Sequence, residues 1–80
     1  MSIYYLRDEL ESIFNENGIE IIWNENRNYR FSFEIPYLED VIECDKLLDL
    51  LEYFNDVHEN NEDERIEDIC YCLEELVHTA

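Results

Sequence analysis

The chain has 80 residues, with 22 Asp or Glu against five Lys or Arg, a formal net charge of −17 and a hydrophobic fraction of 46%. This length fits one domain, residues 1–80, and the apolar and aromatic content excludes an intrinsically disordered acidic tail. The acidity excludes direct binding to nucleic acid or anionic lipid, because contacts with phosphate groups require Lys and Arg.

The first predicted element is a helix over residues 2–17. Ser2 is placed to cap its beginning, and Gly18 follows its end, where a left-handed residue commonly stops a helix. The apolar residues recur at helical spacing and predict one buried face: Ile3, Leu6, Leu10, Ile13 and Phe14.

A β-hairpin is predicted next, with strands at 19–23 and 29–35 joined by the polar loop 24–28. Pro36 ends the second strand, because proline cannot donate to a sheet ladder. The second strand alternates strictly, which predicts an inward aromatic face and an outward polar face. The inward residues are Tyr29, Phe31, Phe33 and Ile35; the outward residues are Arg30, Ser32 and Glu34.

Residues 37–44 fit either the start of a helix or turn, which we favour, or a short third strand. Two helices are then predicted, at 45–58 and 63–78, and the short connection makes them antiparallel neighbours. The fold class is therefore α+β: an N-terminal helix, a β-hairpin with a possible third strand, and an antiparallel helical pair. The expected core residues of this pair are Leu47, Leu48, Leu50, Leu51, Phe54, Val57, Ile66, Ile69, Cys70, Leu73, Leu76 and Val77.

A row of carboxylates is predicted along the second helix, opposite its apolar side. Five acids follow one another at intervals of three or four residues, so all lie within about 40° of one line. Like charges at this spacing destabilise a helix by about 0.2–0.5 kcal/mol per pair, so stability alone does not account for the row. Its members are Asp45, Asp49, Glu52, Asp56 and Glu59.

The third helix repeats this arrangement. Residues 39–75 hold fifteen acids and two bases, a net charge of −13, against seven acids and three bases in residues 1–38. Two neighbouring rows of carboxylates present a line of negative charge comparable to that of a nucleic acid, and Arg pairs with carboxylate much as with phosphate. The predicted members of this second row are Glu64, Glu67, Asp68, Tyr71 and Glu75, where Tyr71 offers its ring to Arg.

In size, charge and acidic helical faces, the chain resembles small phage-encoded inhibitors of bacterial defence, the anti-CRISPR and anti-restriction DNA mimics. These groups share no signature motif, so the resemblance transfers no residue role. It implies a non-enzymatic inhibitor that occupies the nucleic-acid channel of a CRISPR effector complex or restriction enzyme in the bacterial cytoplasm. The expected partner is a basic nucleic-acid-binding protein or complex, and the chain itself is expected to be a monomer or homodimer.

Two alternatives remain open at this stage. An immunity protein or antitoxin that neutralises one basic nuclease toxin would use the same steered, salt-sensitive association. An adaptor or small dimeric module would instead use the aromatic hairpin, with Trp23, Tyr29 and Phe31 as its interface.

Other sites are weakly indicated, and we expect no cofactor, metal or catalytic residue. Residues 56–67 loosely match a calcium loop, but Asn61 stands where glycine is needed. Cys70 and Cys72 lie about 200° apart on a helix, so they do not converge on one zinc ion. We expect no signal peptide or membrane span, and reduced thiols.

Overall fold

The computed structural model describes residues 3–25 and 28–79, and the side chains within them from Tyr5 onward. The fold is α+β: an N-terminal helix, a three-stranded antiparallel sheet and a C-terminal helical pair. The elements are α1 (Ile3–Glu16), β1 (Ile22–Trp23), β2 (Phe31–Ile35), the 3-10 turn η1 (Pro36–Leu38), β3 (Asp40–Cys44), α2 (Leu47–Asn60) and α3 (Glu64–Thr79).

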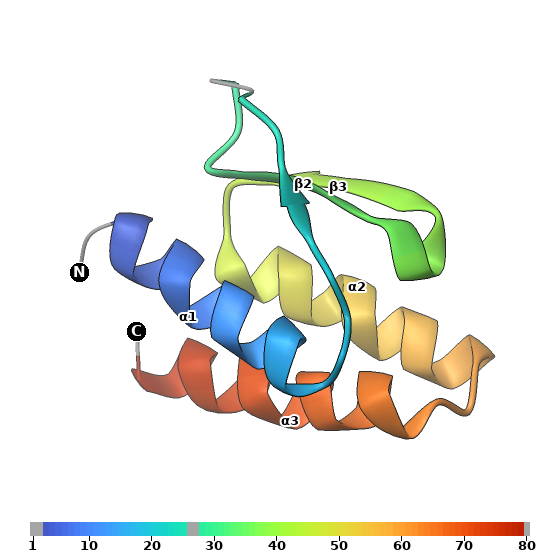
Figure 1. Cartoon of the computed structure of the whole chain (residues 1–80). Coiled ribbons are helices and arrows are strands. Elements are labelled where there is room, and N and C mark those ends of the chain that lie inside the picture. The colour runs from blue at the N-terminus through green and yellow to red at the C-terminus, as the bar shows by residue number, and fades with distance from the viewer. Residues whose placement is uncertain (1–2, 26–27, 80) are drawn as a thin grey trace.

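The sheet has the order β1-β2-β3, so β2 is central and β3 is an edge strand. All three helices lie on one side of the sheet, as Figure 1 shows, and α2 and α3 run antiparallel beside each other. The opposite face of the sheet is not covered by a helix.

The end of α1 follows its sequence signal. Gly18 has a φ of +72°. The N–H of Gly18 bonds the carbonyl of Asn15, and that of Ile19 bonds the carbonyl of Phe14. This pair of bonds is the Schellman arrangement that ends a helix at a left-handed residue, so the predicted role of Gly18 is confirmed. Ser2, the predicted cap, lies outside the described residues, as does the side chain of Ile3.

The core lies where the helices meet the inner face of the sheet. Phe14 of α1 is fully buried, and its ring centroid lies 5.2 Å from that of Phe54 on α2 and 6.0 Å from that of Phe33 on β2. Trp23 joins this cluster at 5.0 Å from Phe33. Tilted and edge-to-face contacts at these distances stabilise the packing beyond the burial of surface alone.

Residues 40–44 form the third strand, so the preference for a helix or turn before Cys44 was wrong for this part, while Tyr37 and Leu38 lie in the turn η1. Pro36 starts the single turn η1, and Glu39 then takes a left-handed conformation with a φ of 52° that reverses the chain. β3 thereby returns along β2, with Ile42 opposite Phe33. Ile42 is buried and extends the apolar face that β2 turns toward the core, which favours a strand at this position. The first strand is shorter than expected, because only Ile22 and Trp23 pair with β2.

Three side chains depart from the predicted burial. Tyr29 was expected to point into the core, but it precedes β2 and is 41% exposed. Leu48 was expected in the core, but it is 50% exposed, because it lies about 100° from the buried side of α2. Ser32 was expected to be exposed on the open face, yet it is buried in the central strand, between Asn24, which follows β1, and Glu43 of β3.

Candidate acidic interface

Four predicted acids lie on α2, on the side opposite its buried residues. Asp49, Glu52, Asp56 and Glu59 are all exposed, while Leu50, Leu51 and Phe54 face the core. Within the described residues, no Lys or Arg pairs with any of these four carboxylates. The row is therefore negative along its length.

Asp45 is not part of this helical row, which corrects the prediction. α2 begins at Leu47, with Lys46 at the N-cap in an extended conformation. Asp45 lies in the bend after β3, and its Oδ1 accepts a hydrogen bond of 3.0 Å from the backbone N–H of Arg30. The side chain thus closes the end of the β2–β3 ladder, a role that helical periodicity does not reveal.

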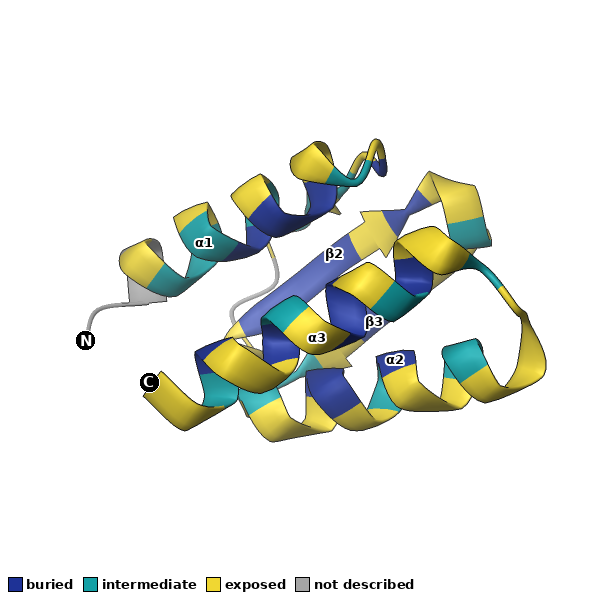
Figure 2. Ribbon diagram, turned by 90° about the horizontal axis from the view of Figure 1, so that it is seen from below, coloured by how far each residue is buried: buried dark blue, intermediate teal, exposed yellow. Residues whose placement is uncertain are grey.

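The second row lies on α3. Glu64, Asp68, Tyr71 and Glu75 are exposed, and Tyr71 is 61% exposed. Glu67 is only partly exposed, because it lies toward α2. Figure 2, seen from the helical side, shows α2 and α3 side by side with exposed residues along both.

The two rows converge at one end of the helical pair. An open hollow of about 530 Å³ lies at the junction of α2 and α3, and it brings Glu59 together with Glu64 and Glu67. Glu62 and Asp63, from the connection between the helices, line the same hollow. The sequence analysis left Glu62 out of the interface, because it searched for helical spacing and Glu62 lies between the helices. Its only sequence signal is its place within the acidic run 62–64.

Asp63 stabilises the fold through hydrogen bonds to both of its carboxylate oxygens. Its Oδ1 accepts a hydrogen bond of 2.9 Å from the backbone N–H of Arg65, which caps the beginning of α3. The hydroxyl of Tyr37 donates to its other oxygen. This bond lowers the pKa of Asp63 and raises the pKa of Tyr37.

Arg65, the only Lys or Arg on α3, points away from α2. The Arg65 guanidinium lies 5.9 Å from the centroid of the Tyr37 ring, and one of its nitrogens lies 3.9 Å from where a Cβ on Gly18 would be. Arg65 is thus turned toward the end of α1 and η1, so it leaves the acids near α2 without a neighbouring cation from this helix.

The three cysteines are free thiols, and the pKa of each is raised, first of all by burial. Nearby carboxylates add to the shift, for example Glu67 beside Cys70. A nucleophilic cysteine needs the opposite environment, because the thiolate is the reactive form.

Cys44 gives a testable consequence. Burial, together with Asp49 and Asp45, raises its pKa to about 11. A raised pKa means that the thiolate is scarce below this value, so alkylation by iodoacetamide at pH 8 is expected to be about 100-fold slower than for a cysteine with the ordinary pKa of 9.0. Mass spectrometry of the Cys44 peptide over a pH series measures this rate. A rate that levels off near pH 9.0 would contradict the assignment.

Across residues 3–25 and 28–79, no cluster of three or more His, Cys, Asp or Glu is arranged to hold a metal ion. The helices within those same ranges also lack the combination of length and apolar character that crossing a bilayer requires. Comparison with protein-family models, curated proteins and solved structures finds no match to this chain.

Proposed function

We propose that this protein is an inhibitor that binds the basic nucleic-acid-binding channel of a bacterial defence complex, a CRISPR effector or a restriction enzyme, by mimicking the negative charge of DNA or RNA. It would act in the cytoplasm of the bacterial host, without catalysis. The observation that carries the proposal is the pair of exposed carboxylate rows on α2 and α3, which no base interrupts on the α2 side.

The dimensions of the helical pair support this proposal. The row on α2 runs from Asp49 to Glu59, so it extends for about 15 Å, the length of about four base pairs at 3.4 Å each. Packed helix axes lie about 8–10 Å apart, which allows the side chains of one basic groove to contact both rows. Arg side chains in such a groove pair with carboxylates in the bidentate geometry that they use for phosphates.

The aromatic hairpin is less suited to be the main interface. Phe31 and Phe33 are 1% and 0% exposed, and Trp23 contacts two side chains of α1. Its Nε1 donates a hydrogen bond of 2.5 Å to Glu11, and the Arg7 guanidinium lies 4.3 Å from the ring centroid. These aromatic side chains are used for the core and for the contact between the sheet and α1.

A competition experiment tests the proposal. Immobilised protein is incubated with bacterial lysate at about 50 mM salt, and bound proteins are eluted with duplex DNA or RNA. We expect basic nucleic-acid-binding proteins to be retained and then displaced by nucleic acid. The triple variant Glu52→Gln, Asp56→Asn, Glu59→Gln is expected to bind the retained protein about tenfold more weakly, which corresponds to about 1.4 kcal/mol.

The matched control is Asp8→Asn, Glu20→Gln, Glu25→Gln, which removes the same number of exposed acids from outside α2 and α3. It is expected to bind like the unmodified protein. Retention that nucleic acid does not compete would indicate an immunity-type contact beside the nucleic-acid site and contradict mimicry. Equal weakening by both triple variants would show that net charge, and not the two rows, determines binding.

A further inference from the structure

The free edge of the sheet forms a second surface, separate from the helical rows. β3 is an edge strand, and Val41, its second residue, is 49% exposed. Because Val41 precedes the buried Ile42 in the strand, its side chain lies on the face away from the core. Val41 lines two neighbouring hollows, one of about 300 Å³ and one of about 550 Å³. The two hollows share Val41 and follow one another along β3, and together they are called the strip.

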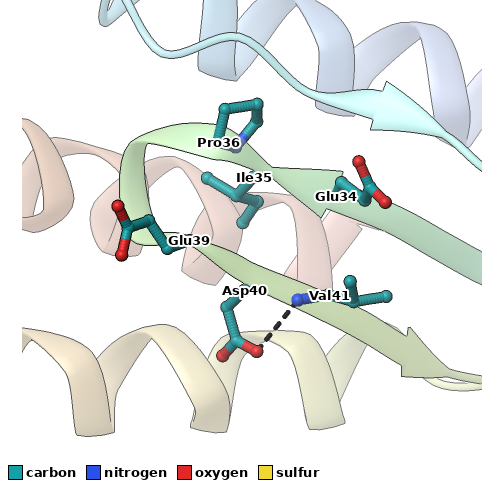
Figure 3. Close-up of a pocket in the computed structure, with 6 residues that line it drawn as sticks. All are labelled: Glu34, Ile35, Pro36, Glu39, Asp40 and Val41. Carbon is teal, nitrogen blue, oxygen red and sulfur yellow. Dashed lines mark hydrogen bonds between the residues drawn. The ribbon is translucent and has the colours of Figure 1, made fainter.

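Both hollows combine apolar floors with carboxylate rims. Figure 3 shows the smaller one, which is lined by the acids Glu34, Glu39 and Asp40 together with Ile35, Pro36 and Val41. The larger one has the rings of Tyr29 and Tyr53 in its lining, with Asp45 and Asp49 at the side of α2. Among the described residues, Lys46 is the one base that lines either hollow.

Asp40 already accepts a hydrogen bond from a backbone N–H at the free edge of β3, that of Val41. The N–H of Asn24 donates to the carbonyl of Ser32, so the backbone N–H and C=O groups of Ser32 and Glu34 point toward β1. Val41 lies opposite Glu34. Its N–H therefore points away from β2, to the free edge of the sheet. Asp40 Oδ1 accepts that N–H at 2.9 Å, and Asp40 Oδ2 accepts the Tyr53 hydroxyl at 2.6 Å. Strand addition by another chain is thus hindered at Val41, and side chains provide the contacts that remain there.

We propose that this strip binds an extended, arginine-bearing segment of a basic protein partner. A guanidinium is planar and weakly hydrated, so it stacks on tyrosine and apolar surface while its edge donates to carboxylates. The rings of Tyr29 and Tyr53 and the exposed Val41 provide the first kind of contact; Glu34 and Asp49 provide the second. A second copy of the chain is disfavoured, because it would bring the same carboxylates against one another at a net charge of −17 each.

This binding site for an arginine-bearing segment extends the proposed inhibitor function. It rests on that function only in assuming that the partner is basic. The test uses a hexapeptide that alternates Arg and Ser, titrated into ¹⁵N-labelled protein and followed by ¹H–¹⁵N NMR. We expect the largest shifts at the amides of residues 40–45 and at Glu34. The double variant Glu34→Gln, Val41→Thr is expected to weaken peptide binding at least about threefold, and a Lys–Ser peptide is expected to bind more weakly than the Arg–Ser peptide.

The matched control is Glu20→Gln, Leu48→Gln, which removes one exposed acid and one half-exposed apolar side chain from outside the strip and the two carboxylate rows. It is expected to leave peptide binding unchanged. Shifts confined to α2 and α3, equal weakening by both double variants, or equal binding of the Lys and Arg peptides would each overturn the proposal. So would a dimer that Val41→Thr converts to a monomer. Because no nucleic acid is present, this test can fail while the competition experiment succeeds, and the reverse.

Discussion

Replacing Phe14 with Ala is expected to lower the free energy of unfolding by about 3–5 kcal/mol, the range for removing a large aromatic side chain from a core. Phe14 is fully buried and contacts the rings of Phe33 and Phe54. Its loss therefore weakens the contacts of α1 with both the sheet and α2. A domain of this size has little stability in reserve, so the variant is expected to be largely unfolded at 37 °C.

Urea denaturation followed by circular dichroism measures this effect. The control is Tyr71→Ala, which also removes an aromatic ring, but one that is 61% exposed. Its stability is expected to stay within about 0.5 kcal/mol of the unmodified protein. If Phe14→Ala and Tyr71→Ala had similar unfolding midpoints, the packing described for Phe14 would be wrong.

Raising the NaCl concentration from about 20 mM to about 500 mM is expected to increase the free energy of unfolding by about 1–2 kcal/mol. Salt screens repulsion between exposed like charges, and each such pair on a helix costs about 0.2–0.5 kcal/mol. For a domain of this length, the melting temperature would rise by about 5–15 °C. The pairs concerned are Asp49–Glu52, Glu52–Asp56 and Asp56–Glu59 on α2, and Glu64–Glu67 and Glu64–Asp68 on α3.

Differential scanning calorimetry at the two salt concentrations measures the change. The variant Asp56→Lys turns two repulsive contacts of the α2 row into attractive ones, so it is expected to melt higher at low salt and to gain less from added NaCl. Glu25→Lys makes the same change of charge outside the helices and is expected to gain nearly as much from salt as the unmodified protein. Identical salt responses in the two variants would show that the row on α2 is not the source of the repulsion.

This repulsion also bears on the proposed function. Repulsion between these carboxylates destabilises the free protein. A basic groove that neutralises them removes this repulsion, and binding to the partner is favoured as a result. This relief would act on the row on α2 and on the acids that line the hollow with Glu59 and Glu64.

The sequence by itself determined the helices, their buried sides and the exposure of most acids. Periodicity of 3.6 residues separates Leu50, Leu51 and Phe54 from Asp49, Glu52 and Asp56 without reference to the rest of the chain. Gly18 likewise ended α1 by a local rule, since a left-handed residue suffices to close a helix. These features depend on neighbours within about four residues, and for that reason they were predictable.

The tertiary structure alone decided β3, the place of Asp45 and the convergence of the two rows. The segment Asp40–Cys44 becomes a strand because it pairs with β2 and because this pairing buries Ile42. The short sequence of the segment reveals neither the pairing nor the burial. Asp45 leaves the helical row to close the ladder at Arg30, and Glu62 enters the surface from a loop. Each of these outcomes depends on contacts between segments distant in the sequence, where pairing and packing override local preference.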